Sequence, residues 1–215
     1  MTVILIMKLY LSSFLLGNQA TKIFELMPKN NKKIAYCSNA CDYPNVDEER
    51  RKKRDITTIK ELEELGLNVE VLNLQQYFGK KEKLNEKLDE LGGIFFSGGN
   101  TFILRQAMKL SGFDELFHEN LKYREDFLYA GYSAGICVLA PELSGLQQVD
   151  HPDMFPYPQI SETIWEGLGY LDYLILPHYK SDHPESSDID KEVEFCERNN
   201  IKYRTLRDGE VIIIE

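Results

Sequence analysis

Short apolar runs alternate with longer amphipathic stretches along most of the chain. The runs have the length and composition of strands buried on both faces, and they lie at Val3–Leu11, Lys33–Tyr36, Val69–Leu72, Gly93–Phe96, Phe127–Tyr132 and Leu171–Leu176. The stretches between them have the spacing of helices, which we predict at Asp47–Leu65, Lys81–Leu91, Thr101–Lys109 and Asp188–Asn199. Strands that alternate with helices predict an α/β fold, with a mainly parallel sheet and helices on both of its faces.

Two local features complete this pattern. In the first predicted helix, apolar residues three positions apart predict one buried face: Ile56, Ile59, Leu62 and Leu65. Near the C-terminus, Tyr203–Leu206 and Val211–Ile214 flank an Asp208-Gly209 turn and predict a hairpin-like pair of strands. The alternation runs to the end of the sequence, so we expect one α/β domain over residues 1–215.

The alternation breaks between residues 140 and 165. Four prolines prevent a regular element there: Pro141, Pro152, Pro156 and Pro158. The same segment carries ionisable and aromatic side chains, among them Asp150, His151 and Trp165. Long irregular loops in compact domains are uncommon and often functional, so we expect this segment to have a functional role.

The composition is that of a globular protein, with 43% hydrophobic and 28% charged residues in a chain of 215. The net charge of −10 argues against nucleic acid as a partner, because phosphate binding needs a basic face. The four cysteines are Cys37, Cys41, Cys137 and Cys196. Only the first two lie close together, and a zinc site would need two further ligands, so we expect reduced thiols.

The first sixteen residues are apolar but lack the pattern of an export signal. No positive charge precedes the apolar run, Lys8 lies inside it, and it is too short to span a bilayer. A buried first strand explains the run better, with Met7 a candidate natural start and residues 1–6 an upstream extension. We therefore expect a cytoplasmic protein without a membrane partner.

The strongest chemical signal is Gly131-Tyr132-Ser133-Ala134-Gly135, which follows a predicted strand and precedes a helix-forming stretch. A strand-turn-helix elbow is crowded and strains its central residue, which explains a glycine on either side. Such an elbow lifts the serine hydroxyl out of the sheet and aims the N-terminus of the following helix at it. The pattern predicts that Ser133 is the nucleophile of a hydrolase, whereas a plain helix cap is the alternative.

A second turn has the same position relative to its strand. The run Gly93–Phe96 ends in Ser97-Gly98-Gly99, and Asn100 or Thr101 then caps a predicted helix. Backbone amides at Gly98 and Gly99, together with that of Ala134, would form an oxyanion hole. We also expect Asn100 to contact substrate.

A histidine at the end of another predicted strand supplies a base for Ser133. His178 follows Leu174-Ile-Leu-Pro177, and the carboxyl ends of parallel strands meet at one edge of a sheet. A direct hydrogen bond of about 3 Å between the imidazole and the serine hydroxyl is therefore expected. His183 is a competing base that we otherwise expect to bind substrate, and His151 is a third candidate.

The carboxylate that would orient this histidine has two candidates. Asp150 lies in the irregular loop, and Asp208 lies in the turn between the last two strands. Either side chain can accept the imidazole proton, and the residues alone do not choose between them. Asp153 and Asp172 fit solvated turns better.

In combination, four motifs resemble the aspartyl dipeptidase (dipeptidase E) family of serine peptidases, which is related to the cyanophycinases. They are Ser97-Gly-Gly-Asn-Thr101, Gly131-Tyr-Ser-Ala-Gly135, Pro177-His178-Tyr179 and His183-Pro184-Glu185. The resemblance extends from Lys8 to the Asp208-Gly209 turn, which is nearly the whole chain. It implies a fold like that of class I glutamine amidotransferases, in which serine replaces the cysteine of the elbow.

The resemblance also implies roles for individual residues. Ser133 is the nucleophile, His178 the general base, and the oxyanion hole forms near Gly98, Gly99 and Ala134. For the third member of the triad the resemblance implies either the loop position, here Asp150, or a C-terminal glutamate position, here Asp208. Of the two we prefer Asp150, although its spacing and the shorter side chain of Asp208 both depart from the family pattern.

The resemblance further implies a short peptide substrate, with dipeptides that carry an N-terminal aspartate as the specific case. No metal or organic cofactor is needed, and a homodimer remains open. Two other functions stay under consideration. One is an esterase of the α/β-hydrolase type, which shares the elbow but usually carries an upstream His-Gly oxyanion loop that this sequence lacks. The other is a non-catalytic binding protein on the same scaffold.

Overall fold

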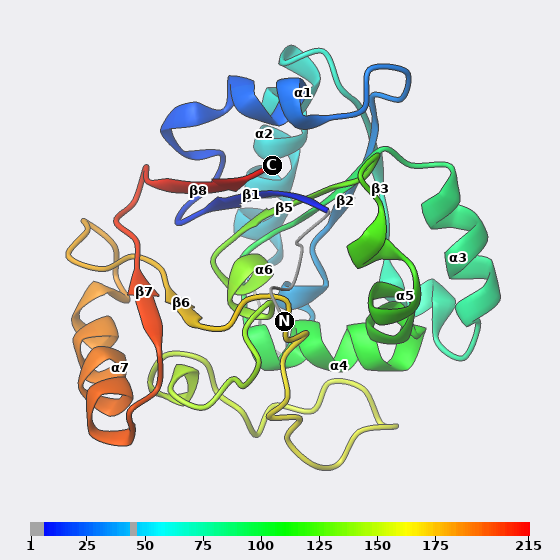
Figure 1. Ribbon diagram of the computed structural model, residues 1–215. Helices are drawn as coiled ribbons and strands as arrows, with labels where there is room; N and C mark the ends of the chain where they lie inside the picture. Colours follow the sequence, from blue (N-terminus) through cyan, green and yellow to red (C-terminus); the bar gives the residue numbers. More distant parts are fainter. Residues whose placement is uncertain (1–6, 44–46) are drawn as a thin grey trace.

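The computed structural model describes residues 7–43 and 47–215 of the chain. Within these residues, the main sheet has the strand order β3-β2-β4-β5-β1-β8 (Figure 1). Its strands are β1 (Lys8–Ser12), β2 (Lys33–Cys37), β3 (Asn68–Val71), β4 (Gly93–Phe96), β5 (Leu128–Tyr132) and β8 (Val211–Ile214). All neighbours pair in parallel except β8, which runs antiparallel to β1. A second, two-stranded parallel sheet contains β6 (Leu174–Leu176) and β7 (Tyr203–Thr205).

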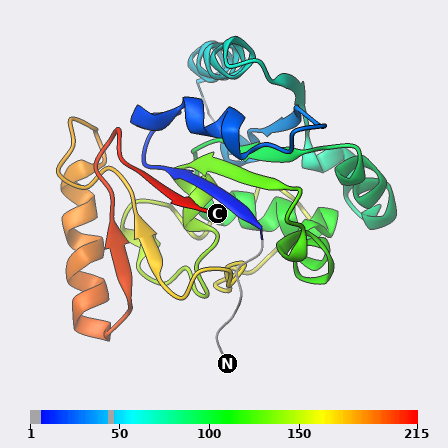
Figure 2. The same ribbon diagram turned by 45° about the horizontal axis from the view of Figure 1, so that its top comes forward.

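Helices cover both faces of the main sheet. They are α1 (Thr21–Leu26), α2 (Glu48–Glu64), α3 (Lys81–Asp89), α4 (Thr101–Ser111), α5 (Phe113–Glu119), α6 (Ala134–Cys137) and α7 (Ser186–Asn199). The helices α1 and α2 lie on one face, and α4, α5 and α6 lie on the other (Figures 1 and 2). The remaining long helix, α7, packs beside β6 and β7. The α/β prediction is therefore confirmed.

The hydrophobic core has two parts because side chains alternate across the strands. In β1, Leu9 and Leu11 enter the larger cluster under α4 and α5, while Tyr10 enters the smaller cluster under α1 and α2. The same alternation separates Phe96 from Phe95 in β4. All five side chains are fully buried. A strand buried on both faces explains why these runs read as continuous apolar sequence.

The predicted strands and long helices agree with the structure apart from their ends. The predicted strand Val3–Leu11 begins outside the described residues and is seen as Lys8–Ser12. Two shorter helices, α1 and α5, were not expected, and the helix after the elbow has only four residues.

Two of the local predictions are wrong. The last strands do not form a hairpin, because β7 pairs with β6 whereas β8 pairs with β1. The Asp208-Gly209 turn thus joins two sheets. On α2, the expected apolar face holds at Leu62, which is buried, and at Ile59 and Leu65, which pack against the core. It is wrong at Ile56, which is 66% exposed, and Thr58 is buried as well. Steps of three residues fall about 60° short of a full turn, so Ile56 and Leu65 end on opposite sides of the helix.

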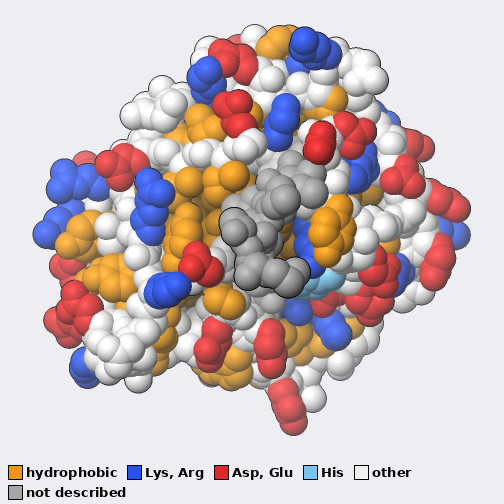
Figure 3. Space-filling view, in the orientation of Figure 1, with side chains coloured by type: hydrophobic (Ala, Val, Ile, Leu, Met, Phe, Trp, Pro, Cys, Tyr) orange, Lys and Arg blue, Asp and Glu red, His pale blue; other side chains and the backbone are white. Residues whose placement is uncertain are grey.

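The surface between these elements is charged and carries the irregular segment. Between Pro141 and Tyr173 the only helical turn among the described residues is a 3-10 turn at Leu146–Gln148. Acidic and basic side chains are interspersed over the face shown in Figure 3. All four cysteines are buried and free. A search of the described residues finds no helix with the length and hydrophobicity needed to cross a membrane.

Candidate active site

The turn between β5 and α6 places Ser133 in a strained backbone conformation. Its φ of 49° and ψ of −119° are unusual for a residue with a side chain. The flanking glycines are required by close packing, since a Cβ at Gly131 or Gly135 would lie 2.6 or 2.4 Å from the Phe96 carbonyl oxygen. The Ser133 side chain remains partly exposed at this edge of the sheet. These are the features expected of a nucleophile elbow.

The glycine turn after β4 lies directly against the elbow. A Cβ at Gly98 would be 3.0 Å from the Cβ of Ser133, and one at Gly99 would be 2.5 Å from the Ala40 carbonyl oxygen. The Gly99 amide has no backbone acceptor among the described residues, whereas the Gly98 amide lies close enough to the Tyr132 hydroxyl to lower the pKa of Tyr132, an effect that burial outweighs. The amide of Ala134 opens α6 and so has no partner within its helix. The amides of Gly99 and Ala134 therefore lose no such backbone partner if an anion binds beside Ser133.

A short 3-10 helix, η2 (Asn39–Cys41), supports the glycine turn from behind. The Cys41 thiol donates to the Gly98 carbonyl oxygen at 3.2 Å, and the Asn100 amide donates to the Ala40 carbonyl oxygen at 2.8 Å. Both contacts fix the backbone on either side of Gly99. The turn therefore has a defined shape before any ligand binds.

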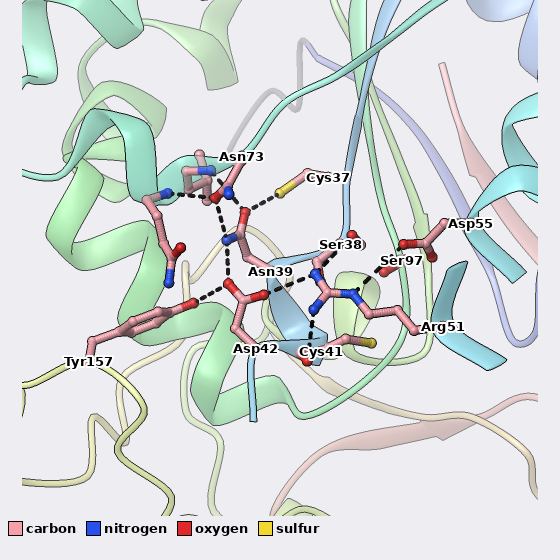
Figure 4. Close-up of polar contacts among 12 residues, drawn as sticks. Cys37, Ser38, Asn39, Cys41, Asp42, Arg51, Asp55, Asn73, Ser97 and Tyr157 are labelled. Atoms are coloured by element: carbon pink, nitrogen blue, oxygen red, sulfur yellow. Dashed lines mark hydrogen bonds and ion pairs between the residues drawn. The ribbon is translucent and has the colours of Figure 1, made fainter. Parts of the chain in front are cut away.

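A buried polar network holds η2 in place (Figure 4). Its centre is Asp42, whose carboxylate accepts from Asn39 at 2.6 Å, from Arg51 at 3.0 Å and from the Tyr157 hydroxyl at 2.7 Å. Tyr157 comes from the irregular segment, so the network joins that segment to the supporting layer of the glycine turn. The irregular segment is thus anchored close to the site, in agreement with its expected functional role.

The second part of the site surrounds His178, which follows β6 and is 2% exposed. The ring Nδ1 lies 2.7 Å from Asp208 Oδ1, so it donates its proton to that carboxylate. The backbone amide of the histidine donates to the Ser13 hydroxyl at 2.9 Å, and the same hydroxyl lies 3.0 Å from Asp208 Oδ1. This arrangement fixes the tautomer that leaves Nε2 free to accept a proton.

The ring of His183 stacks on the ring of His178, with centroids 3.8 Å apart and planes inclined by 8°. Phe14 packs edge-on against both rings. Burial lowers the pKa of His178, the nearby His183 lowers it further, and Asp208 opposes both effects. The His178 imidazole is therefore neutral at pH 7 and can act as a base.

These two histidines and Glu185 offer ligand atoms within 4.8 Å of one another. A metal ion bound by two imidazoles must lie close to both ring planes, because the nitrogen lone pairs lie in those planes. Parallel rings 3.8 Å apart cannot both meet that condition for one ion. Their geometry does not suit a metal.

The structure brings Asp208, and not Asp150, to the imidazole. Asp150 Oδ2 instead accepts from the Thr101 amide at 2.8 Å, at the N-terminus of α4. The side chain of Asn100, which was expected to contact substrate, is also engaged. Its Oδ1 accepts from the Ile103 amide and so caps α4, and its Nδ2 donates to the backbone carbonyl oxygen of His151 at 3.0 Å. The His151 side chain is exposed. The preferred carboxylate of the sequence analysis is thus the one that does not contact His178.

The expected direct hydrogen bond between Ser133 and His178 does not occur among the described residues. Ser133 and Pro177, the neighbour of His178, nevertheless line the same cavity. Hydrogen bonds between catalytic groups are often long in the absence of substrate and shorten when it binds. Ser133 and the residue that precedes His178 therefore border one cavity, although no hydrogen bond joins the serine to the histidine.

Comparison with known proteins supplies the family. The profile of peptidase family S51 matches residues 16–215, which is nearly the entire chain. The chain belongs to peptidase family S51. Its relatives include an uncharacterized peptidase of Listeria innocua, which is 30% identical over 71% of this chain and 72% of that protein. An uncharacterized peptidase of Listeria monocytogenes is 34% identical over 57% of this chain.

The other matches cover a smaller share of the related protein or have a lower sequence identity. The chain spans only 56% of the Listeria monocytogenes protein and 51% of the Peptidase E of Streptomyces coelicolor, to which it is 29% identical. Among solved structures, a candidate Peptidase E from Listeria monocytogenes has a TM-score of 0.75 at 26% identity, covering 97% of this chain and 94% of that one. A peptidase of an acI-B1 actinobacterium shares the fold, with a TM-score of 0.69 at 16% identity. The resemblance to the peptidase E family is confirmed.

The protein has a second feature at this edge, a small cavity that borders Ser133 and has a volume of about 20 Å³. We call it the carboxyl cavity because Asp150, Glu185 and Glu192 line it. Burial raises the pKa of Asp150 to about 6 and that of Glu192 to about 9, and it also raises the pKa of Glu185. Repulsion by neighbouring carboxylates adds to the last two shifts.

Three residues of the S51 site were missed by sequence reasoning. Ser13 directly follows the first strand, so its place at the carboxyl edge of the sheet was a usable signal. Glu185 stands beside His183 in a motif that was noticed, but no role was given to it. Glu192 lies within α7, and nothing in its sequence context distinguishes it from the other acidic residues of that helix.

Proposed function

We propose that this S51 peptidase is a serine peptidase that hydrolyses short peptides through an acyl-enzyme on Ser133. One observation carries the proposal: a strained elbow serine lies at the same edge as a buried histidine whose Nδ1 is bonded to a carboxylate. Nucleophile, base and orienting acid are the parts that acyl transfer requires.

In the proposed mechanism, His178 Nε2 accepts the Ser133 proton as the hydroxyl oxygen attacks the peptide carbonyl carbon. The resulting oxyanion is held by the amides of Gly98, Gly99 and Ala134. The imidazolium then gives its proton to the leaving amine as the C–N bond breaks. Water, deprotonated by the same histidine, releases the acyl group and restores the serine hydroxyl. No step needs a metal or an organic cofactor.

Asp208 is the orienting carboxylate in this mechanism, because it is hydrogen-bonded to His178 Nδ1 and Nε2 is the nitrogen that reacts. It would hold the productive tautomer and stabilise the imidazolium that forms in the transition state. Asp150, which was preferred from the sequence, has its Oδ2 engaged by the Thr101 amide. Its position in the carboxyl cavity fits a role in substrate binding better than one in proton transfer.

The substrate class is proposed from the resemblance of the sequence motifs to the dipeptidase E family. Similarity to the Peptidase E of Streptomyces coelicolor supports a peptide substrate, and dipeptides with an N-terminal aspartate are the specific case to test. We further propose that the protein acts in the cytoplasm, where such peptides arise from protein turnover.

The test is hydrolysis of a dipeptide and isopeptide library by the wild type and by Ser133→Ala. Loss of the nucleophile in a triad lowers kcat by about 10⁶-fold, so the variant should be inactive in practice. Ser161→Ala, which changes an exposed serine of the irregular segment, is the matched control and should keep full activity. Peptide hydrolysis retained by Ser133→Ala would refute the proposal. Short acyl esters in the same panel identify an esterase if they alone are cleaved.

A further inference from the structure

The carboxyl cavity contains acidic groups that the proposed mechanism does not use. Glu192 is 1% exposed, and its Oε2 has no hydrogen-bond partner among the described residues. Glu185 lies nearer the surface, with 45% of its side chain exposed. The cavity thus has one carboxyl at its buried end and one towards solvent.

No lysine or arginine among the described residues pairs with Asp150, Glu185 or Glu192. Buried carboxyls are ordinarily paired or hydrogen-bonded, because an unpaired polar atom away from water costs free energy. Burial, with repulsion by the neighbouring carboxylates, raises the pKa of Glu192 to about 9. Asp150 accepts from the Thr101 amide and Glu185 lies 3.9 Å from His183 Nδ1, so Glu192 Oε2 is the acceptor of this cavity for which the described residues supply no partner.

We propose that the carboxyl cavity binds a primary ammonium group of the substrate, with Glu192, Glu185 and Asp150 as its acceptors. The proposal rests on the proposed function, because it assigns a specificity site to the same peptidase. An ammonium group would stabilise the ionised form of each of the three carboxyls, and it donates three hydrogen bonds. A substrate carboxylate would be repelled.

The size of the cavity limits what can enter it. A volume of about 20 Å³ holds one group of the size of a water molecule. An ammonium group has that size, whereas a guanidinium or an imidazole does not. The substrate is therefore recognised here by a single –NH₃⁺ group.

The position of the cavity next to Ser133 indicates which ammonium group would fit. In a peptide with a free N-terminus, the α-ammonium nitrogen is two bonds from the first carbonyl carbon. A cavity that borders the nucleophile can therefore hold that group while Ser133 reaches the carbonyl. Recognition of the α-ammonium would restrict cleavage to the bond after the first residue. A lysine ε-ammonium is the other source of the same chemistry.

The test compares three matched peptides with the wild type and Glu192→Gln. The first peptide has a free N-terminus and a neutral first residue, the second is its N-acetyl form, and the third is N-acetylated with lysine first. Because a hydrogen bond to a charged group contributes about 1.5–3 kcal/mol, we expect acetylation to lower kcat/KM by about 10- to 100-fold. Glu192→Gln should lower kcat/KM for the free peptide by a similar factor and leave the acetylated one unchanged.

Two controls separate this inference from the proposed function. Glu194→Gln alters an exposed acid two residues along α7 and should have no effect. Labelling of Ser133 by a fluorophosphonate reports the nucleophile without using the cavity, so it should proceed at the wild-type rate in Glu192→Gln. If the wild type neither reacts with the fluorophosphonate nor hydrolyses peptides, the proposed function itself is wrong.

Binding to Ser133→Ala gives a readout without turnover. An ammonium entering the cavity should ionise Glu192, so binding of the free peptide should release a proton, measured by calorimetry in buffers of different ionisation enthalpy. Glu192→Gln, combined with Ser133→Ala, should abolish that release.

Rapid cleavage of the acetylated lysine peptide alone assigns the cavity to the ε-ammonium and supports ammonium recognition. Equal cleavage of free and acetylated neutral peptides, unaltered by Glu192→Gln, overturns the proposal.

Discussion

The main sheet and the small β6–β7 sheet contribute to the site in different ways. The main sheet positions Ser133 through local backbone geometry, with a positive φ and glycines packed against a neighbouring strand. The region around β6 and β7 positions His178 through contacts between distant parts of the chain. The backbone amide of His178 is hydrogen-bonded to Ser13, 165 residues away, and its ring is hydrogen-bonded to Asp208, 30 residues away. The proposed nucleophile is placed by its own sequence neighbours, while the proposed base is placed by tertiary contacts.

This difference has an energetic side. Holding a residue with a side chain at positive φ costs about 1–3 kcal/mol, which the packed strands around the elbow must supply. The histidine depends instead on hydrogen bonds to a carboxylate and a hydroxyl, each of which can be removed singly. Substitutions should therefore affect the elbow mainly through folding and the histidine mainly through catalysis.

The largest effect is expected for Asp208→Asn. The amide cannot hold the Nδ1–H tautomer as the carboxylate does, and the corresponding change in a well-studied triad lowers kcat by about 10⁴-fold. Peptide hydrolysis near pH 7 measures the loss, and the thermal midpoint should stay close to that of the wild type. Asp172→Asn is the control, since that carboxylate is 76% exposed and pairs only with Lys202. If Asp150→Asn abolished proton transfer while Asp208→Asn did not, the assignment of the orienting carboxylate would be reversed.

A large effect on stability is expected at the elbow for Gly135→Ala. The added Cβ would lie 2.4 Å from the Phe96 carbonyl oxygen, so strand and helix must separate. Overpacking of this kind costs about 1–3 kcal/mol in the free energy of unfolding, measured by denaturant titration. Gly79→Ala has open space around its Cβ and serves as the comparison, although its φ of 65° carries a strain of its own. Equal losses in the two variants would show that packing against Phe96 is unimportant.

The same contrast explains how much of the fold was predictable. Runs such as Gly93–Phe96 are buried on both faces, so their apolar sequence alone identifies them as strands. Pairing of the last strands was mispredicted because a short run with a turn on either side does not reveal its neighbour. Tertiary packing determines that β8 pairs with β1, and the periodicity of apolar residues carries no information about such pairing.

The site divides in the same manner. Ser133 and the Gly98-Gly99 turn were found because glycines at tight turns leave a local pattern. The preference for Asp150 over Asp208 is not matched by the contacts of His178, since either carboxylate can reach an imidazole and their distances depend on the folded chain. Ser13 was missed because a buried serine after a strand has the same sequence appearance as any strand end.

A smaller effect is expected for Ser13→Ala, which tests the contacts that join the two regions. The hydroxyl accepts from the His178 amide and donates towards Asp208 Oδ1, so its loss should misplace the catalytic pair. A hydrogen bond to a charged group contributes about 1.5–3 kcal/mol, which corresponds to a decrease in kcat of about 10- to 100-fold. KM should change little, because this hydroxyl lies behind the imidazole. Ser12→Ala, whose hydroxyl donates only to the Phe14 carbonyl oxygen, should retain activity.

The smallest effect is expected for His183→Phe, which keeps an aromatic ring beside His178 and removes the ionisable imidazole of His183. The general base works only when neutral, so activity falls as pH drops through its pKa, and a lowered pKa extends activity towards acid. Burial and His183 both lower the pKa of His178. Removing His183 should raise the pKa of His178 and move the acid limb of kcat/KM to higher pH. His118→Phe, on the exposed side of α5, should leave the limb in place, and a shift to lower pH in His183→Phe would contradict the repulsion between the two rings.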